Sequence, residues 1–247
     1  MSQVVLITGA SRGIGKGLVA KYLIQENTTV IATVRDTNSP KTKELESLPR
    51  GNASHLIIER IIADDSHSAS KAIANLQTQH NISHIDIAIA NAGICDHWGP
   101  VVEASEEDIL SHFEINTLGP LRLFKAVAPL LQNGKAPKFI YISTLLASIG
   151  FIGKMETLTG PYGMSKAAGN FMVRKIHVEN GYLVTLAVDP GLVQTDLGDR
   201  AAQYYGLEKA PMTLEDCVNG IVAQIDKAEK STTSGSFVNT SGEKVDW

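Results

Sequence analysis

The stretch VVLITGASRGIG, residues 4–15, sets an apolar run directly before a glycine-rich turn, and a helical pattern follows the turn. Gly9, Gly13 and Gly15 permit a tight turn, let the backbone approach a pyrophosphate and direct a helix N-terminus at its negative charge. A strand before the turn and a helix after it favour a dinucleotide-binding loop. An ordinary glycine-rich turn is the alternative.

Apolar runs of this kind recur along the chain and alternate with longer amphipathic patterns. The further runs are 29–34, 56–62, 85–90, 138–143, 182–188 and 236–240. Strands that are apolar throughout are buried on both faces, and their alternation with helices is typical of a parallel sheet covered on both sides. The pattern predicts one α/β domain over residues 1–247, a doubly wound (Rossmann) parallel sheet of about seven strands. Two long segments without clear periodicity, near 144–160 and 191–212, follow strands and are predicted to be substrate loops at the ligand-binding edge of the sheet.

Composition excludes several classes of protein and partner. The chain has 247 residues, 43% hydrophobic and 19% charged, with a net charge of −4 and no basic block that would bind nucleic acid. Cys95 and Cys217 form no CxxC motif and the histidines are scattered, so we expect neither a metal site nor a disulfide framework. No apolar run approaches the roughly 20 residues that span a bilayer, and the chain enters a strand without a basic leader, which predicts a cytoplasmic protein.

The stretch GPYGMSK, residues 160–166, places Tyr162 and Lys166 four residues apart at the start of a helical pattern. On a helix this spacing puts both side chains on one face, where the ammonium favours the ionised phenol. The pair therefore predicts a tyrosine acid that works near neutral pH. A half-buried tyrosine beside a solvated lysine is the alternative.

The end of the second apolar run, ATVRD at residues 32–36, bears on cofactor choice. Enzymes that prefer NAD usually place an acid at the end of this strand for the ribose 2′-hydroxyl, whereas NADP needs a cation for the 2′-phosphate. Thr33 stands where the acid is expected, and Arg35 and Arg12 outweigh Asp36. The charge balance predicts NADPH rather than NADH.

Five motifs together resemble the short-chain dehydrogenase/reductase family, in its order and spacing and over essentially the whole chain. They are TGASRGIG (8–15), NAG (91–93), Asn116 within FEINTLG, YGMSK (162–166) and DPGLVQT (189–195). The stretch PYGMSKAAGNFMVRKIHVEN and the C-terminal TSGSFVNTSGEKVDW are further similar to fungal norsolorinic acid ketoreductases and carbonyl reductases.

The resemblance implies roles for catalytic residues. Tyr162 would be the general acid, and Lys166 would lower its pKa while holding the nicotinamide ribose. Asn116 would anchor a water that resupplies protons through Lys166. Thr144 stands in the position of the family's serine and would bind the substrate carbonyl. Because strand side chains alternate, only one of two neighbours can face Tyr162, and Ser143 or Ser148 is the alternative to Thr144.

The resemblance also implies a set of cofactor contacts. Asn91 would meet the adenosine ribose, Gly93 would leave room for the cofactor, and the DPGLVQT segment would wrap the nicotinamide. Ile62 stands where a polar residue usually contacts the adenine, so this contact falls to Ala63 or Asp64 or is absent. The implied cofactor-binding residues are Gly9, Ser11, Arg12, Gly13, Ile14, Gly15, Arg35, Ala63, Asp64, Asn91, Ala92, Gly93, Tyr162, Lys166, Pro190, Gly191, Val193 and Thr195.

The sequence thus predicts an NADPH-dependent oxidoreductase that transfers hydride to a ketone or aldehyde, with an aromatic or polyketide-like small molecule as substrate. An NAD-linked alcohol dehydrogenase and a non-catalytic dinucleotide sensor are the alternatives. Trp98 and Phe151 are candidates for an aromatic-accepting pocket. The resemblance implies a homodimer or homotetramer formed through the long helices that begin near Ser105 and Gly160.

Overall fold

The computed structural model describes residues 2–154 and 158–247, and these fold around a parallel β-sheet. The strands pair in the order β3-β2-β1-β4-β5-β6-β7, and every neighbouring pair is parallel. Their bounds are β1 Gln3–Thr8, β2 Thr28–Val34, β3 His55–Arg60, β4 Ile87–Ala90, β5 Lys138–Ile142, β6 Val184–Asp189 and β7 Ser236–Asn239. The seven predicted strands and the doubly wound fold are confirmed, with ends that shift by up to two residues.

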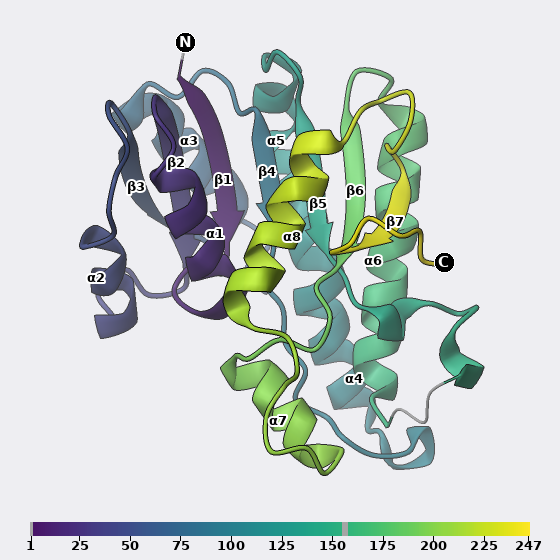
Figure 1. Cartoon of the computed structure of the whole chain (residues 1–247). Helices are drawn as coiled ribbons and strands as arrows, with labels where there is room; N and C mark the ends of the chain where they lie inside the picture. The colour runs from purple at the N-terminus through teal and green to yellow at the C-terminus, as the bar shows by residue number, and fades with distance from the viewer. Residues whose placement is uncertain (1, 155–157) are drawn as a thin grey trace.

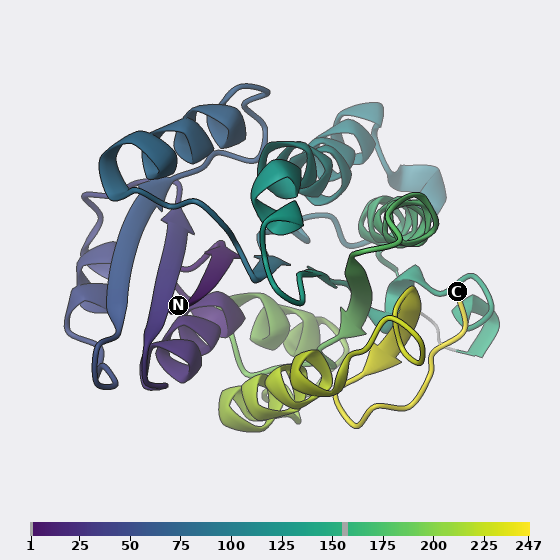
Figure 2. The same ribbon diagram turned by 90° about the horizontal axis from the view of Figure 1, so that it is seen from above.

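Helices cover both faces of this sheet (Figures 1 and 2). They are α1 Gly13–Leu23, α2 Pro40–Glu46, α3 Ser68–His80, α4 Glu106–Phe113, α5 Gly119–Gln132, α6 Gly160–Glu179, α7 Asp196–Tyr204 and α8 Leu214–Lys227. A π-helix, Glu114–Leu118, joins α4 to α5, and short 3-10 turns lie at Val101–Glu103, Leu145–Ala147 and Ile152–Lys154.

The two faces hold separate apolar cores because strand side chains alternate. Val5 and Ile7 of β1 belong to one core, with α1 and α8, whereas Val4 and Leu6 belong to the other, with α3, α5 and α6. Figure 2 shows the two helix layers on opposite sides of the sheet. Burial on both faces explains why the strand sequences are apolar without alternation.

The order of the strands reverses at β1, which pairs with β2 on one side and β4 on the other. In doubly wound folds ligands bind outside the carboxyl ends of the strands at such a point. Loops after β1, β4, β5 and β6 therefore converge on one edge of the sheet.

One of the two predicted substrate loops differs from expectation. The segment 191–212 contains α7, a helix that the sequence did not indicate. Its buried residues are Gly198, Ala201 and Ala202, so its inner face carries small side chains rather than a strong apolar stripe. In the other predicted loop, 144–160, residues 155–157 lie outside the described part of the chain.

The described residues contain neither a membrane-spanning helix nor a cluster of metal ligands. No helix in residues 2–154 and 158–247 is long and apolar enough to cross a membrane. Within the same ranges no three His, Cys, Asp or Glu side chains gather as ligands for a metal ion. Cys95 and Cys217 are both free and buried.

Candidate active site

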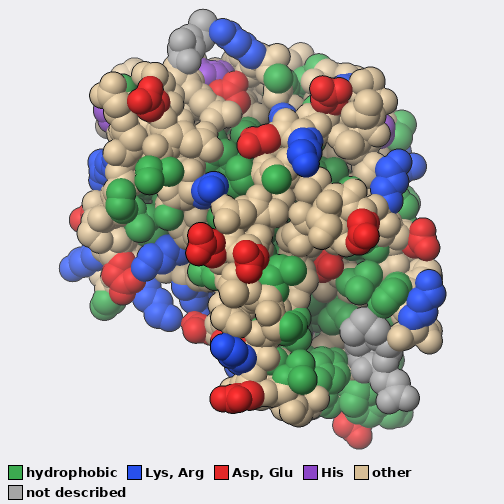
Figure 3. Space-filling model, in the orientation of Figure 1, with side chains coloured by type: hydrophobic (Ala, Val, Ile, Leu, Met, Phe, Trp, Pro, Cys, Tyr) green, Lys and Arg blue, Asp and Glu red, His purple; other side chains and the backbone are tan. Residues whose placement is uncertain are grey.

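A cavity of about 570 Å³ opens at the carboxyl edge of the sheet, where the loops after β1, β4, β5 and β6 meet. Figure 3 shows hydrophobic side chains gathered at the lower end of the molecule, the end at which α7 lies in Figure 1. Of the expected catalytic and cofactor-binding residues, all line the cavity except Gly15 and Asn116. The predicted lining residues are Gly9, Ser11, Arg12, Gly13, Ile14, Arg35, Ala63, Asp64, Asn91, Ala92, Gly93, Thr144, Tyr162, Lys166, Pro190, Gly191, Val193 and Thr195.

The glycine loop forms one wall and is built for close backbone approach. Gly9 has a φ of +66°, which disfavours residues with a side chain. A Cβ on Gly15 would overlap the carbonyl oxygen of Gly9, so only glycine lets α1 start this close to β1. The Asn91 amide donates to the carbonyl of Thr8 at 2.9 Å and ties this loop to the loop after β4. The N-cap of α1 is Arg12, whose side chain makes no capping hydrogen bond, so the first backbone N–H groups of α1 point at the cavity without a side-chain acceptor.

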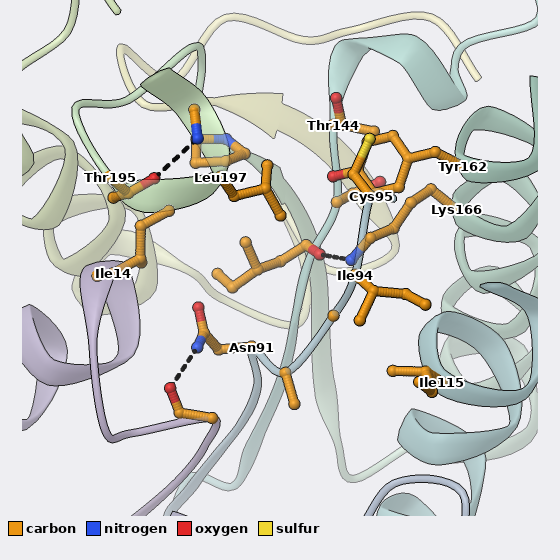
Figure 4. A pocket seen from close by; sticks show the side chains of 18 of the residues that line it. Ile14, Asn91, Ile94, Cys95, Ile115, Thr144, Tyr162, Lys166, Thr195 and Leu197 are labelled. Atoms are coloured by element: carbon orange, nitrogen blue, oxygen red, sulfur yellow. Dashed lines mark hydrogen bonds between the residues drawn. The ribbon is translucent and has the colours of Figure 1, made fainter. Parts of the chain in front are cut away.

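Tyr162, Lys166 and Thr144 gather at the opposite end of the cavity (Figure 4). The Lys166 ammonium donates to the carbonyl of Ile142 at the end of β5, at 2.7 Å. Its nitrogen lies 5.9 Å from the centre of the Tyr162 ring. Helix α6 thus carries acid and cation on the face that meets the end of β5, as their spacing predicts. The thiol of Cys95 lies beside them (Figure 4).

Asn116 supports this end from behind. It is fully buried within the π-helix, and its side chain makes two reciprocal hydrogen bonds with the backbone of Ile94, each of 2.9 Å. The same amide donates to the Ser165 hydroxyl at 3.0 Å. Asn116 therefore joins the loop after β4 to α6, which fixes two walls of the site relative to each other.

The register at the end of β5 separates the two candidate hydroxyls. Ser143 is buried and its hydroxyl donates to the Asn170 side chain at 2.6 Å, inside the α6 layer. Thr144 is extended, with φ −164° and ψ 148°, so its side chain points the opposite way from that of Ser143. Both residues line the cavity, but the Ser143 hydroxyl is bound to Asn170. The Thr144 hydroxyl accepts the backbone N–H of Leu146 at 3.3 Å and lies at the same end of the cavity as Tyr162. Ser148 is buried and does not line the cavity.

The protonation of the Tyr162–Lys166 pair differs from the sequence expectation. Burial raises the pKa of Tyr162 above its ordinary value, and the negative charge of the Asp189 carboxylate adds to the effect. Burial also lowers the pKa of Lys166 to about 7. The prediction that Lys166 makes Tyr162 a stronger acid is wrong for the free protein, because desolvation outweighs the neighbouring cation.

The end of β2 corrects the expected position of the cofactor-discriminating residue. Thr33 is buried and faces away from the cavity, whereas Val34 and Arg35 line it. Val34, one residue later than Thr33, is therefore the last β2 side chain that faces the cavity. The guanidinium of Arg12 pairs with Asp196 at 2.7 Å, and Lys41 approaches the same carboxylate at 3.4 Å.

The wall on the adenine side comes from the end of β3. Ile61, Ala63 and Asp64 line the cavity, whereas Ile62, the residue expected there, does not. The Ala63 carbonyl accepts a hydrogen bond from Arg122 at 2.9 Å, which holds this segment against α5.

The mouth of the cavity carries an aromatic cluster. Trp98 and Tyr205 line the cavity, and Tyr204 stacks on Trp98 with ring centres 5.2 Å apart. Arg200 of α7 pairs with Asp96 at 3.3 Å, so charge and aromatic contacts both bind α7 to the loop after β4. Phe151, the other aromatic candidate, is not among the lining residues.

Sequence reasoning missed Asp189, although it lies in a motif that was singled out. Its carboxylate is buried at the end of β6 and accepts the backbone N–H of Leu145 at 2.9 Å. It thereby joins the loop that carries Thr144 to the loop after β6. A buried acid beside the proline and glycine of the motif was the available signal.

Comparison with known proteins identifies the family. The family model for the short chain dehydrogenases matches residues 3–205. The chain belongs to the short-chain dehydrogenase family. It is therefore an oxidoreductase of a family that uses nicotinamide dinucleotides.

Individual relatives extend this assignment. A norsolorinic acid ketoreductase of Dothistroma septosporum is 42% identical over 250 residues, which cover 98% of this chain and 91% of the relative. A second, from Emericella nidulans, is 42% identical and covers 99% of this chain and 93% of the relative. The crystal structure of an NADPH-bound carbonyl reductase from chicken fatty liver superposes with a TM-score of 0.86 at 28% identity, covering 100% of this chain and 99% of that one. These relatives support carbonyl reduction.

Proposed function

We propose that this chain is an NADPH-dependent reductase that transfers hydride to a ketone or aldehyde carbonyl, with Tyr162 as the proton donor. The observation that carries the proposal is the convergence of Thr144, Tyr162 and Lys166 at one end of the cavity, opposite the glycine loop. Hydride from NADPH forms the new bond to carbon, and a proton to oxygen completes the alcohol.

The cavity fits such a cofactor along its length. The glycine loop leaves no Cβ between the backbone and the pyrophosphate position, and the uncapped start of α1 supplies N–H donors and positive dipole charge. Arg35 follows the end of β2 and Arg12 precedes α1, and both line the cavity and could supply the cations that a 2′-phosphate needs. Val34 offers no carboxylate for the ribose hydroxyl of NADH.

Thr144 and Tyr162 would hold the substrate carbonyl between their hydroxyls. Both side chains line the same end of the cavity, where one carbonyl oxygen could accept from each hydroxyl. Tyr162 then gives its proton to the oxygen as negative charge develops there. General acid catalysis of this kind contributes about 10²–10⁴ in rate.

Lys166 would work in its charged form. Its ammonium is fixed by the Ile142 carbonyl on the side of Tyr162 and stabilises the tyrosinate that remains after proton transfer. Asn116 holds the loop after β4 against helix α6. This contact would keep the Tyr162 hydroxyl and the Lys166 ammonium in place relative to the cavity.

Tyr162 is protonated in the free protein, because burial raises its pKa. A protonated phenol is the form that donates to a carbonyl oxygen, which supports reduction. An NAD-linked alcohol dehydrogenase would use the same residues in the opposite direction, so the cofactor contacts at Arg35 and Arg12 separate the two alternatives. A non-catalytic dinucleotide sensor would need no proton donor.

The mouth supports an aromatic or polyketide-like substrate. Trp98 and Tyr205 present ring surfaces to the cavity, and rings of this kind pack against flat aromatic ligands. The relatives that are named norsolorinic acid ketoreductases support a ketone as the reacting group.

The proposal is tested by following NADPH oxidation with aryl ketones, diketones, quinones and aldehydes. We expect turnover with at least one aromatic ketone, and loss of that turnover in Tyr162→Phe with NADPH binding retained. Absence of turnover across the panel, with NADPH binding intact, would favour the sensor.

We also propose that the protein self-associates through α6. Met164, Phe171 and Val178 lie seven residues apart along α6 and are 42%, 69% and 72% exposed. A stripe of this spacing suits packing against a second helix. Analytical ultracentrifugation should give a dimer or tetramer for the wild type and a smaller species for Phe171→Glu. A monomeric wild type would refute the proposal.

A further inference from the structure

Tyr141 lies directly beneath the Lys166 ammonium, although it is not part of the catalytic set. It is fully buried on β5, between Ala90 of β4 and Ala187 of β6. The centre of its ring is 4.7 Å from the Lys166 nitrogen, closer than the Tyr162 ring at 5.9 Å. A cation at this distance over a ring is attracted by the negative charge of the ring face.

The Tyr141 hydroxyl fixes the ring in this place. It donates to the backbone carbonyl of Asn116 at 2.8 Å. That carbonyl belongs to the π-helix Glu114–Leu118, where the backbone departs from the regular α-helical hydrogen-bond pattern. The contact sets the position of Tyr141 relative to the same residue that joins the two walls of the site.

Helix α6 has a glycine, Gly169, where the end of the Tyr141 ring packs against it. A Cβ on Gly169 would overlap the Tyr141 hydroxyl and the ring carbons next to it. Glycine inside a helix is less favourable than alanine, so the chain accepts a weaker helix position at this contact. The Tyr141 ring and hydroxyl therefore pack closely against the backbone of Gly169.

The buried Lys166 ammonium has no charged partner among the described titratable groups that face it. In the described part of the chain the Lys166 ammonium donates one hydrogen bond, to Ile142, and burial lowers its pKa to about 7. The titratable groups that face it are Tyr162 of α6, the Cys95 thiol of the loop after β4 and Tyr141 itself. Each is neutral at pH 7 because burial raises its pKa. No full negative charge among them offsets the buried ammonium.

We propose that Tyr141 is a positioning residue for the reduction proposed above, whose ring face holds the Lys166 side chain charged and in place. The inference rests on the proposed function only in its consequence for turnover. The contact between ring and ammonium exists in the free protein and is measured there without substrate or cofactor.

The test replaces Tyr141 by phenylalanine and then by 4-fluoro-, 3,5-difluoro- and 3,4,5-trifluorophenylalanine. Fluorine changes the size of the ring only slightly but withdraws electron density from its face. The series therefore weakens the attraction between the ring and the Lys166 ammonium while the packing stays nearly constant. The titration of Lys166 is followed in the free protein by NMR of ¹³Cε-labelled lysine, and its resonance is identified by its loss in Lys166→Met.

We expect the pKa of Lys166 to fall stepwise along the series, by on the order of one pH unit from phenylalanine to the trifluoro residue. The alkaline limb of kcat/KM should move to lower pH in the same order. Phe139 is the matched control, since it is a buried aromatic on the same strand and the same face. The same fluorinated residues there should leave the Lys166 titration unchanged.

A Lys166 pKa that stays constant along the Tyr141 series would overturn the inference, as would an equal shift from the Phe139 series. A stepwise shift in a protein that reduces no carbonyl would instead uphold the contact and refute the proposed function. The two failures are therefore distinguishable.

Discussion

Replacing Arg35 by alanine is expected to remove much of the preference for NADPH. Arg35 lines the cavity at the end of β2, and in the described residues its guanidinium makes no ion pair or hydrogen bond. It is free to bind a 2′-phosphate. A hydrogen bond to a charged partner is worth about 1.5–3 kcal/mol, and the exposed position favours the lower value. About 1.5 kcal/mol corresponds to roughly a tenfold rise in the KM for NADPH.

Arg12 is expected to contribute less to NADPH binding than Arg35. Arg12 already pairs with Asp196 at 2.7 Å and must weaken that contact to serve a phosphate. Because both partners are more than half exposed, at 54% and 59%, the pair is worth about 0.2–1 kcal/mol. Arg12→Ala should therefore raise the KM for NADPH only a few fold, about half the free-energy effect of Arg35→Ala.

Adding an acid at Val34 should reverse the preference from NADPH to NADH. Val34→Asp places a carboxylate in the cavity, where it repels a 2′-phosphate and accepts from the ribose hydroxyl of NADH. The same change at Thr33 would bury a charge away from the cavity and destabilise the fold.

Steady-state kinetics with NADPH and NADH measure these effects as a ratio of kcat/KM values. Arg50→Ala is the control, because Arg50 is an exposed arginine outside the cavity whose guanidinium bonds a backbone carbonyl. An Arg35→Ala ratio equal to that of Arg50→Ala, or a wild type that prefers NADH, would refute the reasoning.

Four further outcomes are expected. Tyr162→Phe should keep NADPH binding and lose about 10²-fold or more in kcat, measured by fluorescence titration and turnover. Thr144→Val should impair kcat strongly and Thr144→Ser mildly, whereas Ser143→Ala should act mainly on the unfolding midpoint; the reverse ranking would contradict the register. The free energy of unfolding should rise with pH between about 7 and 10 relative to Lys166→Met, because the unfolded lysine binds a proton there that the folded one, with a pKa of about 7, has lost. Lys230→Met should cost about 2 kcal/mol in urea unfolding, since its ammonium donates to three backbone carbonyls between the end of α6 and β6; an unchanged midpoint would count against that role.

The sequence predicted features that depend on short, local spacing. The glycine loop between β1 and α1, and the pair Tyr162 and Lys166 on one helical face, fall where their spacing places them. Strand number and order of elements follow from apolar runs, because burial on both faces leaves a strong signal. Helix α7 was missed because its buried face consists of glycine and alanine.

The register at a strand end is harder to predict than local spacing, since an error of one residue reverses the direction of a side chain. At β5 the family motif selected Thr144 over Ser143; both line the cavity, but the Ser143 hydroxyl is bound to Asn170. At β2 the expected end of the strand was the guide, and it indicated Thr33, whereas Val34 faces the cavity. The end of an apolar run does not fix which of two neighbouring side chains faces the cavity.

The sign of the Tyr162 pKa shift shows why spacing cannot replace the three-dimensional environment. Sequence identifies which cation stands one helical turn away but not how much water the pair retains. Burial can shift a pKa by up to 3–5 units, whereas the ammonium of Lys166 lies 5.9 Å from the ring and is itself partly neutral near pH 7. Desolvation therefore wins in the free protein. Burial and the Asp189 carboxylate at the end of β6, which both raise the pKa of Tyr162, arise only when the folded sheet brings other strands to the pair.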